Sequence, residues 1–123
     1  MRTAFLSGKT RSVEYRRDQL KQLAFLLQDN QDAIAHAVAQ DLGRSKFETV
    51  FAELMLTVKE TVHAVNKIKF WAKNERVDRG LPWVFHRPHI RKEPKGTVLV
   101  IGAWNYPIVS KAVFQSSAVD ACI

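Results

Sequence analysis

The stretch that decides the fold reads GTVLVIGAWNYP and spans residues 96–107. Five aliphatic or β-branched residues run between Gly96 and Gly102, a pattern typical of a strand buried on both faces of a parallel sheet. Trp104 and Asn105 follow at the carboxyl end of this strand, where open α/β sheets bind their ligands. We therefore predict the first strand of a Rossmann-like sheet, with a candidate site directly after it.

The chain before this strand has helical periodicity. Apolar side chains recur every three or four residues over 13–27, after a cap at Thr10 or Ser12. The same spacing continues over 34–42, and Gly43 is placed to end that helix in the left-handed conformation. We predict two amphipathic helices here.

A third helix begins with SKFE at residues 45–48, which has the pattern of a capping box. Behind it an apolar stripe continues to about Asn74, which corresponds to a helix of roughly 28 residues, or about 40 Å. The stripe consists of Val50, Phe51, Leu54, Met55, Val58, Val62, Val65, Ile68 and Trp71.

The pattern changes between residues 75 and 95, because one glycine and three prolines exclude a regular helix there. Residues 83–85 and 89–91 have the composition of two short edge strands on either side of Pro88. His86 and His89 have no cysteine or carboxylate beside them at ligand spacing, so we predict no metal site.

The composition is that of one globular domain: 123 residues, 46% hydrophobic and 25% charged, with a net charge of +7. The stretch from Lys67 to Lys95 holds nine basic and three acidic residues. We interpret it as a solvated face, because no RNA-binding signature, zinc-finger spacing or P-loop accompanies it. No nucleic-acid partner is expected.

Cys122 is the single cysteine, which indicates a reducing compartment. No apolar run approaches the roughly 20 residues of a transmembrane helix, and residues 1–11 lack the apolar middle section of a secretory signal. We expect a cytoplasmic protein without a transmembrane segment.

Residues 92–107 resemble the start of the cofactor domain of aldehyde dehydrogenases. Upstream, SGKTR at 7–11, DLGR at 41–44 and FWA at 70–72 are similar to the class-three branch, which includes the fatty-aldehyde enzymes. The resemblance covers about residues 2–107, with matching order and spacing. It implies oxidation of an aldehyde substrate to a carboxylic acid with NAD or NADP.

The resemblance also assigns residues. Asn105 matches the family's oxyanion-hole asparagine, whose amide donates a hydrogen bond to the alkoxide that forms when a thiolate attacks the aldehyde. Losing such a donor costs about a hundredfold or more in rate. Ile101, Gly102 and Trp104 match positions that line the nicotinamide-ribose end of the cofactor.

The chain departs from the family pattern after about Ile108. The family's Lys-Pro-Ser-Glu sequence, its cysteine nucleophile and its glutamate bases have no match, and Cys122 is not expected to replace the nucleophile because a chain end frays. The expectation is an amino-terminal fragment, truncated before the catalytic cysteine and inactive by itself, whose binding of cofactor is doubtful.

These observations define an α+β fragment of an α/β protein. It comprises a helical segment over 1–74, edge strands in a basic connector over 75–95, the start of the cofactor-binding domain over 96–107, and a non-family tail over 108–123. Two alternatives remain open. One is a non-catalytic helical module that pairs with a full-length relative as a homo- or hetero-dimer, and the other is a truncated product without function.

We predict that the purified chain, mixed with NAD and a medium-chain aldehyde, forms no NADH, because it supplies an oxyanion donor but no nucleophile. Absorbance of NADH measures this directly. Turnover that disappears in Asn105→Ala would contradict the prediction of an inactive chain.

Overall fold

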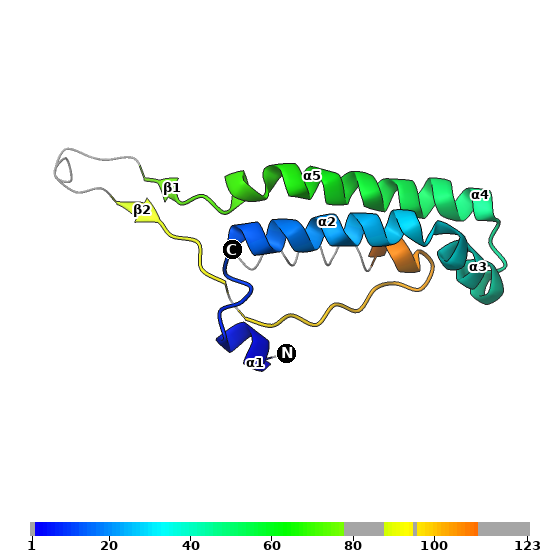
Figure 1. Cartoon of the computed structure of the whole chain (residues 1–123), viewed down its shortest axis with the longest axis horizontal. Coiled ribbons are helices and arrows are strands. Elements are labelled where there is room, and N and C mark those ends of the chain that lie inside the picture. The colour runs from blue at the N-terminus through cyan, green and yellow to red at the C-terminus, as the bar shows by residue number, and fades with distance from the viewer. Residues whose placement is uncertain (1, 78–87, 95, 111–123) are drawn as a thin grey trace.

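A computed structural model describes residues 2–77, 88–94 and 96–110 of the chain (Figure 1). The elements are α1 (Arg2–Leu6), α2 (Val13–Asp29), α3 (Gln31–Leu42), α4 (Lys46–Thr49), the π-helix η1 (Val50–Leu54), α5 (Met55–Trp71), β1 (Glu75–Arg76) and β2 (His89–Ile90). Residues 107–110 form a further helical turn. None of the helices in this described part combines the length and hydropathy that crossing a bilayer requires.

Helices α2 and α5 lie side by side and antiparallel, and they enclose the core (Figure 1). Leu20 of α2 packs against Ala64 and Ile68 of α5, and all three side chains are buried. Arg17 Nε donates to the carbonyl oxygen of Val65 at 3.2 Å, which ties the two helices together beside this core. Apolar burial of this kind supplies most of the stability of a helix pair.

The predicted caps at Ser12 and Ser45 and the predicted helix end at Gly43 are confirmed. Ser12 caps α2 by accepting the amide three residues on, at 3.3 Å, and Ser45 caps α4 by accepting the amide of Glu48 at 3.2 Å. Gly43 ends α3 with φ of 65°, a left-handed conformation that favours glycine. The chain therefore turns sharply between α3 and α4, and Arg44 lies in this turn.

The third predicted helix is present, but part of it is π-helical and some of its buried side chains differ from those predicted. It runs from Lys46 to Trp71, shorter than expected, and contains a π-helical turn over Val50–Leu54. Of the predicted stripe, Phe51, Met55 and Val62 are exposed. Leu54 and Ile68 of the stripe are buried as predicted, and Val50, Val58, Val65 and Trp71 are half-buried. The other buried side chains of this helix were not predicted: Thr49, Glu53, Thr57, Thr61 and Ala64.

Two physical causes explain this difference. The π-helical turn inserts an extra residue into the helical repeat, so the side chains before and after it no longer follow one regular stripe. The buried face also carries threonines, whose hydroxyls bond to their own helix: Thr61 Oγ1 donates to the carbonyl oxygen of Thr57 at 2.8 Å. The hydrophobic pattern alone therefore predicts only part of the buried face and misses its threonines.

The edge hairpin forms, although with a different first strand. β1 pairs antiparallel with β2, and Glu75 lies opposite Ile90 while Arg76 lies opposite His89. The predicted strand at 89–91 is thus confirmed as β2, and its partner is β1. The predicted strand at 83–85 lies outside the described residues.

The segment 96–102 is not a strand in this chain, contrary to the prediction. Most of its side chains are exposed, with Leu99 at 82% and Ile101 at 85%, while Val100 is half-buried. A strand requires neighbours for its backbone hydrogen bonds, and no segment among the described residues pairs with this one. It runs instead from the hairpin back toward the α3–α4 end of the helix pair (Figure 1).

Two buried threonines on α5 generate a prediction. The Thr57 hydroxyl has no hydrogen-bond partner within the described part of the chain, whereas Thr61 has one. A buried hydroxyl without a partner costs about 1–3 kcal/mol. We expect Thr57→Val to raise the free energy of unfolding by about 1 kcal/mol.

Thr61→Val is the matched control, because it loses a hydrogen bond at a site of equal burial, and we expect it to be the less stable of the two variants. Urea denaturation followed by circular dichroism measures both. Equal loss of stability in the two variants would show that the Thr57 hydroxyl is satisfied.

Candidate functional site

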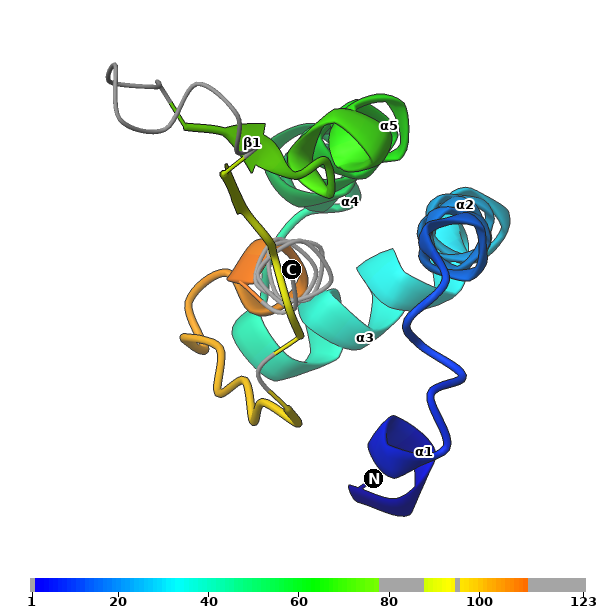
Figure 2. The same cartoon turned by 90° about the vertical axis from the view of Figure 1, so that its left-hand side faces the viewer.

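Asn105 lies in an exposed turn between the unpaired segment and the helical turn at 107–110. Trp104 before it is 60% exposed and Ile101 is 85% exposed, while Gly102 is half-buried. All four predicted site residues therefore lie on one stretch at the surface. Figure 2, which views the molecule along α2 and α5, shows α1 set apart and the turn at 107–110 close to α3.

The carboxylate of Glu53 holds the chain after Asn105. Its Oε2 accepts the backbone amide of Ile108 at 2.8 Å and that of Val109 at 3.3 Å. These amides belong to the first turn of a helix, which has no acceptors of its own for them, and Pro107 has no amide to donate. Glu53 thus acts as a helix cap supplied from another element.

The guanidinium of Arg44 holds the carbonyl side of the same turn. Its Nη2 donates to the backbone carbonyl oxygen of Asn105 at 2.6 Å. Its Cζ lies 4.7 Å from the centre of the Tyr106 ring, a cation–π contact. Its Nη1 pairs with Oε1 of Glu53, so one ion pair connects both ends of the turn.

This ion pair is buried. The side chain of Glu53 is fully inaccessible and that of Arg44 is 12% exposed. A buried charge requires both a partner and further hydrogen bonds, and here every oxygen of the carboxylate has a partner. The pair therefore serves as a fixed polar joint between η1, the α3–α4 turn and the backbone around Asn105.

Comparison with known proteins decides the family. The family model described as aldehyde dehydrogenase matches residues 1–118 of the 123. The chain belongs to the aldehyde dehydrogenase family. Members of this family act on aldehydes and use NAD or NADP. The match includes part of the segment 108–123, whose separation as a non-family tail stays a prediction.

Aldehyde dehydrogenase family 3 member B1 of Mus musculus is 42% identical over 108 residues, which are 88% of this chain and 23% of that protein. Aldehyde dehydrogenase, dimeric NADP-preferring, of Rattus norvegicus is 38% identical over 106 residues, 86% of this chain and 23% of that protein. These relatives confirm the predicted class-three branch. The chain spans about a quarter of their length.

A solved structure of AldH from Staphylococcus aureus in a substrate-bound state has the same fold in this region. The two superpose with a TM-score of 0.93 at 31% identity, over 98% of this chain and 26% of the other. The described helices and hairpin therefore match an amino-terminal part of the aldehyde dehydrogenase fold.

Sequence reasoning did not identify Arg44 and Glu53 as site residues. In the sequence, Arg44 is the last residue of the DLGR motif at 41–44, and Glu53 lies within the apolar stripe of the third helix. A carboxylate between Phe51 and Leu54 was the available signal, since a charge among apolar side chains indicates a paired group. Its partner could not be read from the spacing.

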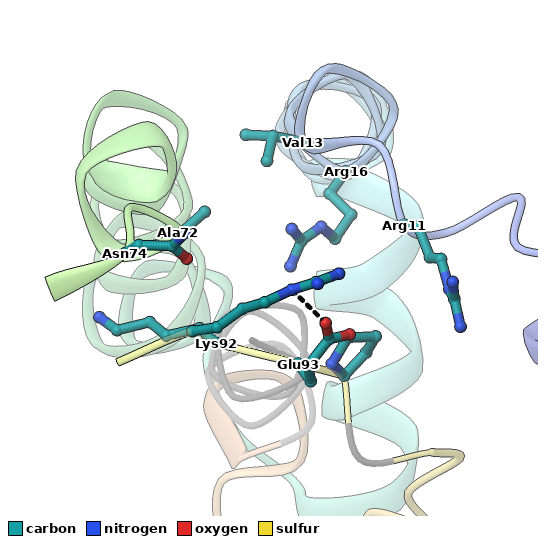
Figure 3. A pocket seen from close by; sticks show the side chains of 9 residues that line it. Arg11, Val13, Arg16, Ala72, Asn74, Lys92 and Glu93 are labelled. Atoms are coloured by element: carbon teal, nitrogen blue, oxygen red, sulfur yellow. Dashed lines mark ion pairs between the residues drawn. The ribbon is translucent and has the colours of Figure 1, made fainter. Parts of the chain in front are cut away.

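A cavity of about 230 Å³ lies at the other end of the helix pair (Figure 3). It is bounded by the start of α2, the end of α5 and the chain after β2, and the charged side chains that line it are Arg11, Arg16, Arg91, Lys92 and Glu93. Arg91 pairs with Glu93, and Lys92 Nζ lies 2.9 Å from Glu75. None of the predicted site residues lines this cavity, so the cavity is separate from the Asn105 turn.

Ile101, Gly102 and Trp104, the predicted cofactor residues, lie close together in sequence on the surface segment before Asn105. The side chains of Ile101 and Trp104 are exposed, and Gly102 and Ala103 lie between them in the sequence. The described residues contain no cluster of three metal-ligating side chains. His86 and Cys122 lie outside them.

Proposed function

We propose that this chain, inactive by itself, contributes the oxyanion donor Asn105 to an aldehyde dehydrogenase that oxidises aldehydes to carboxylic acids with NAD or NADP. The observation that carries the proposal is the Asn105 turn, which is exposed but has its backbone held by a buried ion pair. Its occurrence in a chain of the aldehyde dehydrogenase family supports this reaction. A fixed, accessible amide donor is what oxyanion stabilisation requires.

The residues of this chain act by orientation. The Asn105 amide, which is neutral, donates more strongly to an alkoxide than to the carbonyl from which the alkoxide forms, so it favours the transition state. Ile101, Gly102 and Trp104 present an apolar face to the nicotinamide ring. The cofactor, when bound, accepts the hydride of the aldehyde carbon.

Finer properties are part of the same proposal. The class-three resemblance supports a fatty aldehyde as substrate, since that branch includes the fatty-aldehyde enzymes. The rat relative is named NADP-preferring, which supports testing NADP beside NAD. The single cysteine supports a cytoplasmic location.

A chimera tests the role of Asn105: the 108 residues of this chain that match mouse aldehyde dehydrogenase family 3 member B1 replace the corresponding segment of that protein. We expect Asn105→Ala to lower kcat about a hundredfold or more, because one oxyanion donor is lost, with a smaller change in the aldehyde KM. Formation of NADH or NADPH measures both constants. A kcat within about threefold of the parent chimera would refute the role.

Association with a family member is the second candidate function. Phe47 and Phe51 stack with ring centres 5.8 Å apart, yet they are 77% and 62% exposed. Exposed aromatic pairs are common at protein interfaces. Pairing with a second copy or a full-length relative would cover them.

We expect the chain to elute as a dimer, or together with a full-length relative, in size exclusion with light scattering. Phe47→Ser combined with Phe51→Ser should shift it to the monomer, because the apolar contact is removed. Phe70→Ser is the control, since Phe70 is 72% exposed at the far end of α5. A monomer at every concentration, alone and with the relative, argues against association.

A further inference from the structure

Contacts hold the backbone on both sides of Asn105, while the residue itself is exposed. Arg44 Nη2 donates to the Asn105 carbonyl oxygen at 2.6 Å, and Glu53 Oε2 accepts the Ile108 amide at 2.8 Å. Two residues, Tyr106 and Pro107, lie between these two contacts. Trp104 and Tyr106 are 60% and 41% exposed, and Tyr106 contacts the Arg44 guanidinium through its ring.

We infer that Arg44 and Glu53 are positioning residues that act through Asn105, and the inference rests on the proposed function. The backbone of Asn105 sets the direction of its Cα–Cβ bond, and this direction sets where the amide can reach. A displacement of about 1 Å in a positioning contact can cost on the order of a hundredfold in rate. An exposed donor therefore needs a rigid support beneath it.

The geometry is specific to this pair of side chains. The Arg44 fork donates in two directions at once, to Glu53 and to Asn105. Lysine presents a single ammonium and lacks the planar fork. Glutamine at position 53 offers one oxygen only, so either Arg44 or the Ile108 amide would face its NH₂ group.

The Arg44–Glu53 pair differs from the neighbouring Arg44–Glu48 pair in its burial. Glu48 also approaches Arg44, with 3.4 Å between Oε1 and Nε, but the Glu48 side chain is 53% exposed. An exposed pair of this kind contributes little. Two carboxylates thus contact one guanidinium, and only the buried one bonds to the Asn105 turn through Ile108 and Val109.

Hydrogen–deuterium exchange of single amides by NMR, on the 123-residue chain, is the first test. We expect Glu53→Gln to speed exchange of the Ile108 and Val109 amides about tenfold, because these amides and Arg44 then compete for a single oxygen. Glu48→Gln is the matched control, with a change within about twofold. Unchanged exchange in Glu53→Gln, with the fold intact, overturns the inference.

The amides of Ala64 and Ile68 report the fold of the helix pair, where both residues are buried. If the Ala64 and Ile68 amides lose their protection from exchange in Glu53→Gln, the fold is disturbed and a second variant is needed. Arg44→Lys serves as that variant, because it retains a positive charge beside Glu53. We expect the Asn105 side-chain NH₂ to gain fast motion in ¹⁵N relaxation of this variant. Motion equal to that of the parent chain overturns the inference.

Activity in the chimera separates a positioning role from a structural one. Glu53→Gln should lower kcat about tenfold or more with little change in the aldehyde KM, and an unchanged kcat overturns the inference. If Asn105→Ala also leaves kcat unchanged, the proposed function fails too. If Asn105→Ala abolishes turnover and Glu53→Gln does not, the inference fails alone.

Discussion

One buried carboxylate, that of Glu53, joins the helical segment to the turn around Asn105. Glu53 belongs to the helical segment, and the two backbone amides that it accepts lie 55 and 56 residues further along the chain. Arg44 neutralises it and bonds to the same turn. Removing one partner from a buried ion pair typically costs about 3–5 kcal/mol, so the placement of the Asn105 turn depends on this contact.

The helix pair supplies the rigid support for that contact. Leu20, Ala64 and Ile68 fix α2 against α5, and the left-handed Gly43 brings Arg44 back beside the start of the third helix. The π-helical turn then carries Glu53 on the buried face. Single π-helical turns are frequent at functional sites, and this one has the carboxylate of the joint within it.

The sequence predicted local features better than tertiary ones. The caps at Ser12 and Ser45 and the left-handed Gly43 follow from chemistry within a few residues, whereas the motif around Asn105 was recognised by its resemblance to a family. The π-helical turn and the pairing of Arg44 with Glu53 depend on contacts that no residue spacing reveals. The strand over 96–102 has the right composition, but composition cannot supply the neighbouring strands that a sheet requires.

A through-hydrogen-bond NMR coupling tests the joint most directly. In the ¹³C,¹⁵N-labelled chain, we expect a correlation between the Ile108 amide nitrogen and the Glu53 carboxylate carbon. The coupling runs through the hydrogen bond of 2.8 Å between the Ile108 nitrogen and Glu53 Oε2, which is bonded to that carbon. Its absence, together with Ile108 exchange as fast as in an unfolded peptide, would contradict the claim that Glu53 holds the Asn105 turn.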